Sequence, residues 1–279
     1  SAVQGQIVEA HRVAVPVSLV DHREVIKFLI DCPDPERLSA QLRQLSDEHG
    51  ADIALQSRLS RCRPYGLAVF DMDSTLISCE VIDELARVAG VGAEVAEITD
   101  RAMRGELDFD ESFRTRLALL KGLDAGAVDE LADQLPVQSG LSEMATTLKA
   151  RGLKLAIFSG GFIPIAERLK NDYGFDHVVA NELEIRDGKV TGKIVPPIVN
   201  REYKAEALGA LASRLGIHTE HCIAVGDGAN DLSMMALAGL GVAFHAKPAV
   251  RAASPIEITH IGLDGVCYLM GHEGEFAVA

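Results

Sequence analysis

Short apolar runs without polar alternation recur along the chain from residue 65 onward, and stretches with helical periodicity separate them. Unbroken apolar runs are typical of strands that are buried on both faces of a sheet. Strands that alternate with helices are typical of a parallel, doubly wound sheet. The pattern therefore predicts an α/β fold whose strands cover residues 67–70, 153–158, 177–180, 222–225 and 241–244.

Two insertions interrupt this alternation. Residues 77–137 are charged and helical in pattern, and they leave the core directly after its first strand, so we expect a helical cap that folds over the end of that strand. Residues 182–195 carry Asp187-Gly188 between two alternating arms, which is a strong β-hairpin signal. We interpret this hairpin as a structural flap.

Residues 1–62 form a separate leading segment. Strand patterns occur at residues 12–19, 23–30 and 51–59, and Asp34-Pro35-Glu36 begins a helix that we expect to end at about His49, before Gly50. The resulting β-β-α-β order resembles part of an ACT-like regulatory module. A regulatory role and a structural or dimerising role, which could join two copies of the chain, both stay open. Residues 61–64 are the expected linker to a catalytic domain that covers residues 65–279.

The first core strand ends abruptly in Asp71 and Asp73, which are followed by hydroxyl residues. Side chains along a strand repeat with a period of two, so we expect both carboxylates on one side at the strand's carboxyl end. Ligands of open α/β sheets bind at that end. Two adjacent carboxylates need a proton or a cation between them, and Mg²⁺ is a hard cation that prefers oxygen ligands. Asp71 could then attack a phosphorus atom, and Asp73 could transfer protons.

The second core strand ends in Ser159-Gly160-Gly161. Glycine lets the backbone approach an anion closely, and free N–H groups at the start of a helix can bind phosphate oxygens. An ordinary Ser-Gly turn is the alternative for this segment by itself. Lys204 begins an amphipathic helical stretch further on, and a lone lysine usually indicates only a solvated surface charge. Its place between the other motifs is what makes it a candidate.

A later strand is followed by Asp227 and, one helical turn further on, by Asp231. We expect Asp227 to meet the first two aspartates across the sheet and to complete an oxygen cage. Asp231 is suited to orient a ligand or a water molecule. By itself, this segment also fits a turn that begins a helix.

Composition narrows the function classes. The chain has 279 residues, with 27 Lys and Arg against 41 Asp and Glu, a net charge of −14. That charge disfavours binding to nucleic acid or to an anionic membrane. We find no apolar run near the ~20 residues that span a bilayer and no basic-then-apolar signal at the amino terminus. The cysteines are odd in number and widely spaced, which disfavours a disulfide framework and suits a reducing cytoplasm.

Together, these four segments resemble the motifs of the haloacid dehalogenase superfamily of phosphotransferases. The superfamily motifs are D-x-D-x-T, a serine at a strand end, a lysine and G-D-x-x-x-D. The resemblance covers about residues 65–270, and no residue departs from the catalytic pattern. Within the superfamily, the closer resemblance is to the phosphoserine phosphatases, and it includes Glu80 and residues 109–120.

The resemblance implies a two-step hydrolysis. Mg²⁺ would be held by the Asp71 carboxylate, the Asp73 backbone carbonyl and Asp227. Asp71 would form an aspartyl-phosphate, while Asp73 would protonate the leaving oxygen and then activate a water molecule. The groups that would stabilise charge on the phosphoryl oxygens are Lys204, Ser159 and the N–H of Gly160.

The cap is where we expect the substrate to be selected. Asp108 is the expected N-cap of a helix on which Phe109 and Arg116 share one face. A guanidinium matches a carboxylate in two hydrogen bonds, although a surface or structural arginine is the alternative. Arg116 would bind the carboxylate of phosphoserine and Glu80 its ammonium. The other residues that the resemblance places near the substrate are Met103, Phe109, Gly161 and Asn230.

Two other functions stay open on the sequence alone. The same residues could hydrolyse another small phosphomonoester, such as phosphothreonine, phosphohomoserine or a sugar phosphate. Glu80 and Arg116 disfavour a sugar, which would match neither charge. A receiver-like signalling module also carries a phosphorylated aspartate and Mg²⁺ on a doubly wound sheet, but receivers are far shorter and need neither Asp73 nor a cap.

Overall fold

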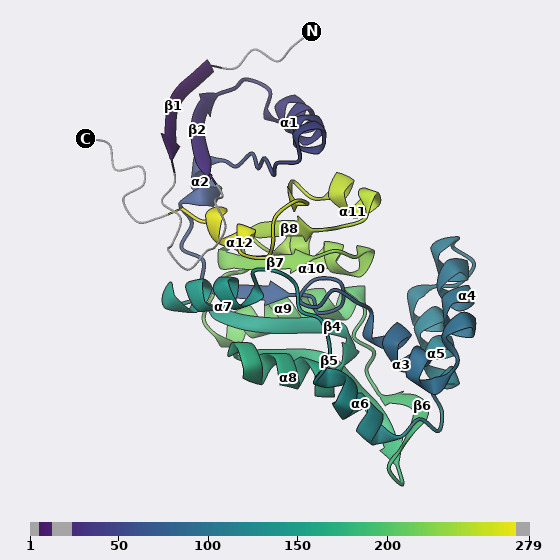
Figure 1. Cartoon of the computed structure of the whole chain (residues 1–279). Helices are drawn as coiled ribbons and strands as arrows, with labels where there is room; N and C mark the ends of the chain where they lie inside the picture. The colour runs from purple at the N-terminus through teal and green to yellow at the C-terminus, as the bar shows by residue number, and fades with distance from the viewer. Residues whose placement is uncertain (1–5, 13–23, 272–279) are drawn as a thin grey trace.

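A seven-stranded sheet forms the centre of the molecule, in the order β6-β5-β4-β3-β7-β8-β9 (Figure 1). The structure, a computed structural model, describes residues 6–12 and 24–271. Neighbouring strands are parallel except for β5 and β6, which pair antiparallel. The strands are β3 (Leu67–Phe70), β4 (Lys154–Phe162), β5 (His177–Arg186), β6 (Lys189–Val195), β7 (Cys222–Gly226), β8 (Leu240–Phe244) and β9 (Ile256–Ile258).

Helices cover both faces of this sheet, which confirms the predicted doubly wound α/β fold. Leu67 and Val69 of β3 pack in one apolar cluster with α9 and α10, whereas Ala68 and Phe70 pack in a second cluster with α7 and α8. Alternate residues of one strand therefore enter separate cores, as expected of a strand buried on both faces. The helices are α7 (Leu141–Ala150), α8 (Ile163–Tyr173), α9 (Arg201–Arg214), α10 (Leu232–Leu237), α11 (Pro248–Ala253) and α12 (Gly265–Tyr268).

The predicted cap is helical, as the charged insertion indicated. It leaves and re-enters the core through two adjacent stalks, which Ile77 and Val137 join by an antiparallel bridge. The Ser78 N–H donates to the Pro136 carbonyl at 2.9 Å, and this contact closes the stalks. The cap helices are α3 (Val81–Ala89), α4 (Gly92–Met103), α5 (Phe109–Leu119) and α6 (Ala125–Ala132).

The predicted hairpin is also present. Asp187 and Gly188 adopt φ angles of 49° and 73° between β5 and β6, and two successive positive φ values are what a type I′ turn requires. β5 is longer than predicted, because its first half pairs with β4 and its second half forms the hairpin. The short strand β9, which the apolar pattern did not predict, extends the opposite edge of the sheet.

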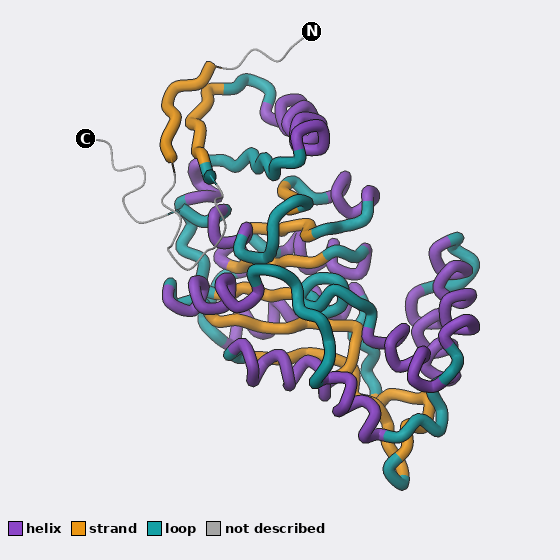
Figure 2. The backbone as a smooth tube through the Cα atoms, in the orientation of Figure 1, coloured by secondary structure: helices purple, strands orange, loops and turns teal. Residues whose placement is uncertain are grey.

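The leading segment stands beside that opposite edge (Figure 2). β1 (Gln6–Arg12) pairs antiparallel with β2 (Ile26–Asp31), and α1 (Pro35–His49) begins at the Asp34 cap and ends at Gly50, as predicted. Most of the strand predicted at residues 12–19 lies outside the described residues.

The strand predicted at residues 51–59 is wrong. Residues 51–57 have no regular secondary structure, and α2 (Arg58–Arg61) follows them. The Asp52 carboxylate explains the difference, because it accepts hydrogen bonds from the backbone N–H groups of Thr259 and Ile261 at 2.6 and 2.9 Å. The segment therefore binds the core through a side chain and does not pair as a strand. The ACT-like resemblance and the domain division stay predictions.

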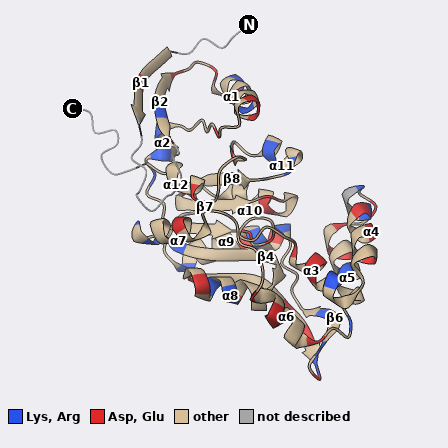
Figure 3. Ribbon diagram, viewed as in Figure 1, with Lys and Arg blue, Asp and Glu red and all other residues tan. Residues whose placement is uncertain are grey.

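Ion pairs also join the leading segment to the core. Arg251 on α11 contacts Asp47 of α1 at 2.7 Å and Glu257 of β9 at 2.9 Å. Figure 3 shows a basic stretch of α11 on the side of the core that faces α1. Within the described ranges, every helix is too short or too polar to cross a membrane.

Candidate active site

Asp71 lies directly after β3, and one of its carboxylate oxygens is held by two donors. The Met72 N–H donates to Asp71 Oδ1 at 2.7 Å, and Lys204 Nζ lies 2.8 Å from the same oxygen. The Asp71 N–H donates to the Val225 carbonyl at 2.9 Å and thereby aligns the ends of β3 and β7. These two donors hold the Asp71 carboxylate in one orientation, with Oδ1 toward Lys204.

Asp73 lies in a turn and not in a strand, so the period of two is not what places it. β3 ends at Phe70, and the N–H groups of Thr75, Leu76 and Ile77 all point to the Met72 carbonyl at 2.8–3.2 Å. Burial, reinforced by the charges of Glu80 and Asp71, raises the pKa of Asp73 well above its usual range. These surroundings favour the protonated form of Asp73, which is the form that a general acid needs.

Lys204 is fully buried, in contrast to the usual position of a lysine. It lies in the first turn of α9, which the Asn200 side chain caps by accepting from the Tyr203 N–H. Its Nζ contacts Asp231 Oδ1 at 2.7 Å as well as Asp71. Burial lowers the pKa of Lys204, but the charges of Asp231 and Asp71 outweigh this effect and raise it. An ammonium has three donors, so one remains for a ligand oxygen.

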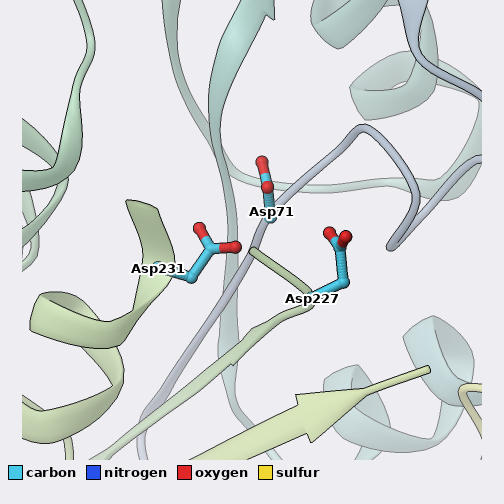
Figure 4. A group of neighbouring side chains, drawn as sticks. All are labelled: Asp71, Asp227 and Asp231. Carbon is cyan, nitrogen blue, oxygen red and sulfur yellow. The ribbon is translucent and has the colours of Figure 1, made fainter. Parts of the chain in front are cut away.

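Asp71, Asp227 and Asp231 surround a common space (Figure 4). One carboxylate oxygen from each lies within 4.8 Å of the others, and all three residues are buried. Burial and the charges of Asp71 and Glu80 raise the pKa of Asp227 to about 7. Such a crowded set of oxygen donors suits a hard cation. The acidic cluster can therefore hold a metal ion, as the sequence predicted for Asp71 and Asp227.

Asp231 differs from the other two aspartates because protein donors occupy both of its oxygens. Lys204 binds Oδ1, and the Gly228 N–H donates to Oδ2 at 3.0 Å. The short 3₁₀ turn at Ala229–Asp231 holds the side chain in this position. Asp231 therefore orients Lys204, whereas the predicted role of Asp231, to orient a ligand or a water molecule, stays a prediction. Assignment of the Asp73 carbonyl as a ligand stays a prediction.

The carboxyl end of β4, which contains Ser159, Gly160 and Gly161 and is called the Ser159 loop below, approaches Asp73 closely. A Cβ atom on Gly161 would lie 2.8 Å from Asp73 Oδ2 and 3.0 Å from Ser159 Oγ, so this position needs glycine. The Gly161 N–H donates to Ser159 Oγ at 2.8 Å, which leaves the O–H of Ser159 as a donor. The structure thus brings Gly161 against Asp73, the predicted proton donor.

Asn181 supports this loop and was missed by the sequence analysis. It is buried in β5, donates to the Gly160 carbonyl at 2.7 Å and accepts from the Val199 N–H at 2.9 Å. Thr75 was quoted as part of the first motif without a role, and its hydroxyl donates to Asp227 Oδ1 at 3.2 Å. A polar residue inside an apolar strand is a signal that could have identified Asn181.

The cap contributes Phe109 and Arg116 from α5. The helix begins at the predicted cap, since Asp108 accepts from the Glu111 N–H at 2.7 Å. Phe109 is 40% exposed, and the tip of its ring lies 3.5 Å from the position of a Cβ on Gly160. Burial lowers the pKa of Arg116, against the charges of Asp83, Glu80 and Asp73. Arg116 thus shares its surroundings with these acidic groups.

Glu80 lies where the chain enters the cap and accepts from the Ser74 hydroxyl at 2.8 Å. Although Glu80 keeps contact with solvent, the protein around it desolvates its carboxylate and raises its pKa. Asn230 is half-buried beside Asp231. Met103 ends α4, and its side chain lies outside what the structure describes. The roles of these residues toward a substrate stay predictions.

Comparisons with known proteins agree on one family. Residues 68–236 match the sequence profile of the haloacid dehalogenase-like hydrolases. The chain is 40% identical to a phosphoserine phosphatase of Archaeoglobus fulgidus, over 90% of this chain and 74% of that protein. It is 45% identical to a phosphoserine phosphatase of Mycobacterium tuberculosis, over 84% of this chain and 57% of that protein.

A solved structure supports the fold over nearly the whole chain. The crystal structure of a HAD-family hydrolase from Salmonella enterica serovar Typhi matches with a TM-score of 0.87 and 35% identity, over 95% of this chain and 90% of that one. The chain spans between half and three quarters of the length of the first curated relatives, namely 57%, 74% and 62%.

Proposed function

The chain belongs to the haloacid dehalogenase-like hydrolases, and on this premise we propose that it is a Mg²⁺-dependent phosphatase that converts O-phospho-L-serine to L-serine and phosphate. The observation that carries the proposal is the buried group of Lys204, Asp71 and Asp231 beside the Ser159 loop. This group combines a nucleophile with a cation that can bind a phosphoryl oxygen. A receiver module would need neither the cap nor Asp73.

In the first step, Asp71 Oδ2 attacks phosphorus and the bond from phosphorus to the serine oxygen breaks. Asp73 gives its proton to that departing oxygen, which leaves as a neutral hydroxyl. Lys204, already placed 2.8 Å from Asp71 Oδ1, binds an equatorial phosphoryl oxygen with its remaining donor. The product is an aspartyl-phosphate.

In the second step, Asp73 is ionised and takes a proton from a water molecule. The oxygen of that water attacks phosphorus, the bond to Asp71 breaks, and inorganic phosphate leaves. Asp71 and Asp227 would hold Mg²⁺, with the Asp73 carbonyl as a third ligand. When bound, Mg²⁺ supplies charge neutralisation for the phosphoryl oxygens and for the crowded carboxylates.

The cap supplies the selection of substrate. Arg116 binds the substrate carboxylate and Glu80 its ammonium, while Phe109 and Met103 cover the apolar side. Asn230, Gly160 and Gly161 lie close to the phosphoryl group. A phosphosugar would leave both charges unmatched, which is costly in a desolvated site. The phosphate ester of another hydroxy-amino acid, such as phosphothreonine, is the second candidate, because it carries the same ammonium and carboxylate.

Phosphate release separates these substrates. We expect the full chain to hydrolyse O-phospho-L-serine faster than phosphothreonine and much faster than sugar phosphates, with Mg²⁺ required. The assay should include O-phospho-D-serine, phosphohomoserine and a small aryl phosphate, each with excess chelator as the control. Faster turnover of a sugar phosphate than of phosphoserine would contradict the proposed substrate. A homodimer through residues 1–62 and a cytoplasmic location remain predictions of the sequence.

A further inference from the structure

The cap has a second attachment besides its stalks. The segment between α5 and α6 pairs with the β5–β6 hairpin through three backbone hydrogen bonds. The Gly122 N–H donates to the Val190 carbonyl at 2.8 Å, the Val190 N–H to the Leu123 carbonyl at 2.8 Å, and the Ala125 N–H to the Gly188 carbonyl at 2.9 Å. Figure 1 shows the hairpin strand β6 beneath the cap helices α4 and α5.

Side-chain packing reinforces this attachment. Val190 is 1% exposed and belongs to the same apolar cluster as Leu117 and Leu120 of the cap. Gly192 of β6 has φ +80° and is buried, and a Cβ atom there would lie 3.1 Å from the Cα and carbonyl oxygen of Ala118. The backbones of β6 and α5 are therefore in contact at a place where no side chain fits between them.

α5 also packs in the core through Phe113, but on the side of α9 it stands away from the rest of the protein. A cavity of about 720 Å³ lies between α5, β6 and the first turns of α9, and residues such as Arg114, Ile194 and Tyr203 line it. Across this space, the Asn200 side chain donates to Asp110 Oδ1 at 3.3 Å. The hairpin is thus a main support of α5 on this side of the molecule.

The base of the same hairpin holds the phosphate end of the site. Asn181, in β5, bonds to the Gly160 carbonyl and to the Val199 N–H, just before the helix that carries Lys204. One hairpin therefore contacts the phosphate loop at its base and the cap at its tip. It can fix the distance between the groups that bind phosphate and the groups on α5.

We propose that the β5–β6 hairpin positions the cap for substrate selection, with Gly192 and Val190 as positioning residues that act through α5 on Phe109 and Arg116. This inference rests on the proposed function, because it assigns to the cap the recognition of the amino-acid part of the substrate. The proposed role of the hairpin concerns the position of α5 alone, and the chemical steps at Asp71 are the same with or without it.

Gly192→Val tests the contact with α5. The added side chain must displace Ala118, and a 1 Å misplacement of a binding group can cost on the order of 100-fold. We expect KM for phosphoserine to rise by about tenfold or more, while kcat/KM for a small aryl phosphate, which lacks the amino-acid groups, stays near that of the wild type. The matched control is Gly152→Val, since Gly152 has φ +84° with open space around it and lies at the far end of β4.

Val190→Ala is the second variant, and it removes packing without backbone strain. Val190→Ala should also raise KM for phosphoserine, but by less than Gly192→Val does. If Gly192→Val does not fold, Val190→Ala alone tests the inference. Hydrogen exchange of residues 109–119 is the readout that needs no substrate. Exchange there should be faster in Gly192→Val and in Val190→Ala than in Gly152→Val.

The outcomes separate the two proposals. A wild-type protein that does not hydrolyse phosphoserine contradicts the proposed function, and the exchange measurement then decides the inference. If phosphoserine and aryl phosphate lose activity equally in folded variants, or if exchange in α5 is unchanged, the hairpin supports only the fold and the inference is wrong. A selective loss with faster exchange in α5 supports it.

Discussion

At the phosphate end of the site, charged side chains are buried and bonded to one another, whereas at the cap end they are partly exposed and separate. Lys204 is fully buried between Asp71 and Asp231. Phe109 is 40% exposed, and Glu80 keeps contact with solvent. The first region would need no rearrangement to stabilise a transferring phosphoryl group, which is the property of a preorganised site.

This difference in burial indicates that the two regions have separate roles, one in the chemistry and one in substrate selection. Groups that would handle phosphorus are attached to β3, β4, β7 and the start of α9, which pack in the core. Groups that would select the substrate lie on the cap, whose position depends on stalks and on the hairpin. Changes at the phosphate end should therefore affect every substrate, and changes at the cap end should affect only some.

Asp71→Asn is expected to have the largest effect. An amide cannot act as the nucleophile, so turnover of all phosphate esters should fall by on the order of 10⁴-fold or more, with no incorporation of labelled phosphate into the protein. Phosphate release and labelling measure this, with exposed Asp129→Asn on α6 as the control. Near-normal turnover in Asp71→Asn would exclude the covalent mechanism. Asp73→Asn should be almost as slow, because the leaving oxygen departs without a proton.

Lys204→Met should damage both activity and stability. It leaves Asp71 and Asp231 buried without their shared cation, and loss of one partner of a buried pair costs about 3–5 kcal/mol. Thermal unfolding in chelator measures this loss. The control is Lys170→Met, which removes a half-exposed pair with Glu167 worth at most about 1 kcal/mol.

A double variant sharpens the same test. Adding Asp231→Asn to Lys204→Met should restore part of the stability, because one unpaired charge is gone, but none of the activity. If Lys204→Met were as stable as the wild type, the ion pairs of Lys204 with Asp71 and Asp231 would not contribute to the stability of the fold.

Glu80→Gln and Arg116→Ala, two changes at the cap end, should reduce turnover of phosphoserine alone. Each loses a charged hydrogen bond to phosphoserine, which costs roughly 1.5–3 kcal/mol, or about tenfold to a hundredfold in kcat/KM. Turnover of a small aryl phosphate should change little. Arg114→Ala is the matched control, since that neighbouring arginine of α5 is exposed and pairs with Asp110. Equal losses on both substrates would mean that these residues support the fold.

Stability without metal should decrease as pH rises. The pKa of Asp227 is raised to about 7, and that of Asp73 is raised in the same direction. Between about pH 4 and pH 7, the folded protein then binds protons that the unfolded chain has lost, so the free energy of unfolding falls with increasing pH. Each kcal/mol lowers Tm by roughly 2–4 °C.

Mg²⁺ should remove the dependence of the free energy of unfolding on pH, because a bound cation favours ionised carboxylates. Melting curves at several pH values, in chelator and in excess Mg²⁺, measure both effects. Asp227→Asn is the control and should reduce the slope observed in chelator. Identical slopes with and without Mg²⁺ would contradict a metal site at these aspartates.

Removal of the leading segment should have the smallest effect on chemistry, since both ends of the site lie after Pro64. A chain that begins at Ser57 keeps α2 and its cap but loses Asp47 and Asp52. We expect retained phosphatase activity and a lower Tm. Asp52→Ala in the full chain should lower Tm without changing activity, because the half-buried N–H groups of Thr259 and Ile261 lose their acceptor, at a cost of at most about 1–3 kcal/mol. A folded but inactive truncation would contradict the domain division.

Local chemistry determined much of the fold from the sequence alone. Apolar runs predicted five strands of the sheet, Asp187-Gly188 predicted the hairpin, and Asp34 and Gly50 predicted both ends of α1. These signals depend on neighbouring residues, so they do not need the rest of the chain. The prediction failed at residues 51–59, because Asp52 satisfies donors more than 200 residues away, between 259 and 261.

Contacts between distant segments were decided only by the tertiary structure. The sequence by itself placed Asp71, Ser159, Lys204 and Asp227 in one family pattern, but not the contact of Lys204 with Asp231, nor the part that Asn181 plays. Gly192 looks like any other glycine until α5 is packed against it. Burial, ion pairing and the shift of a pKa arise from atoms brought together by folding, and a sequence pattern cannot contain those distances.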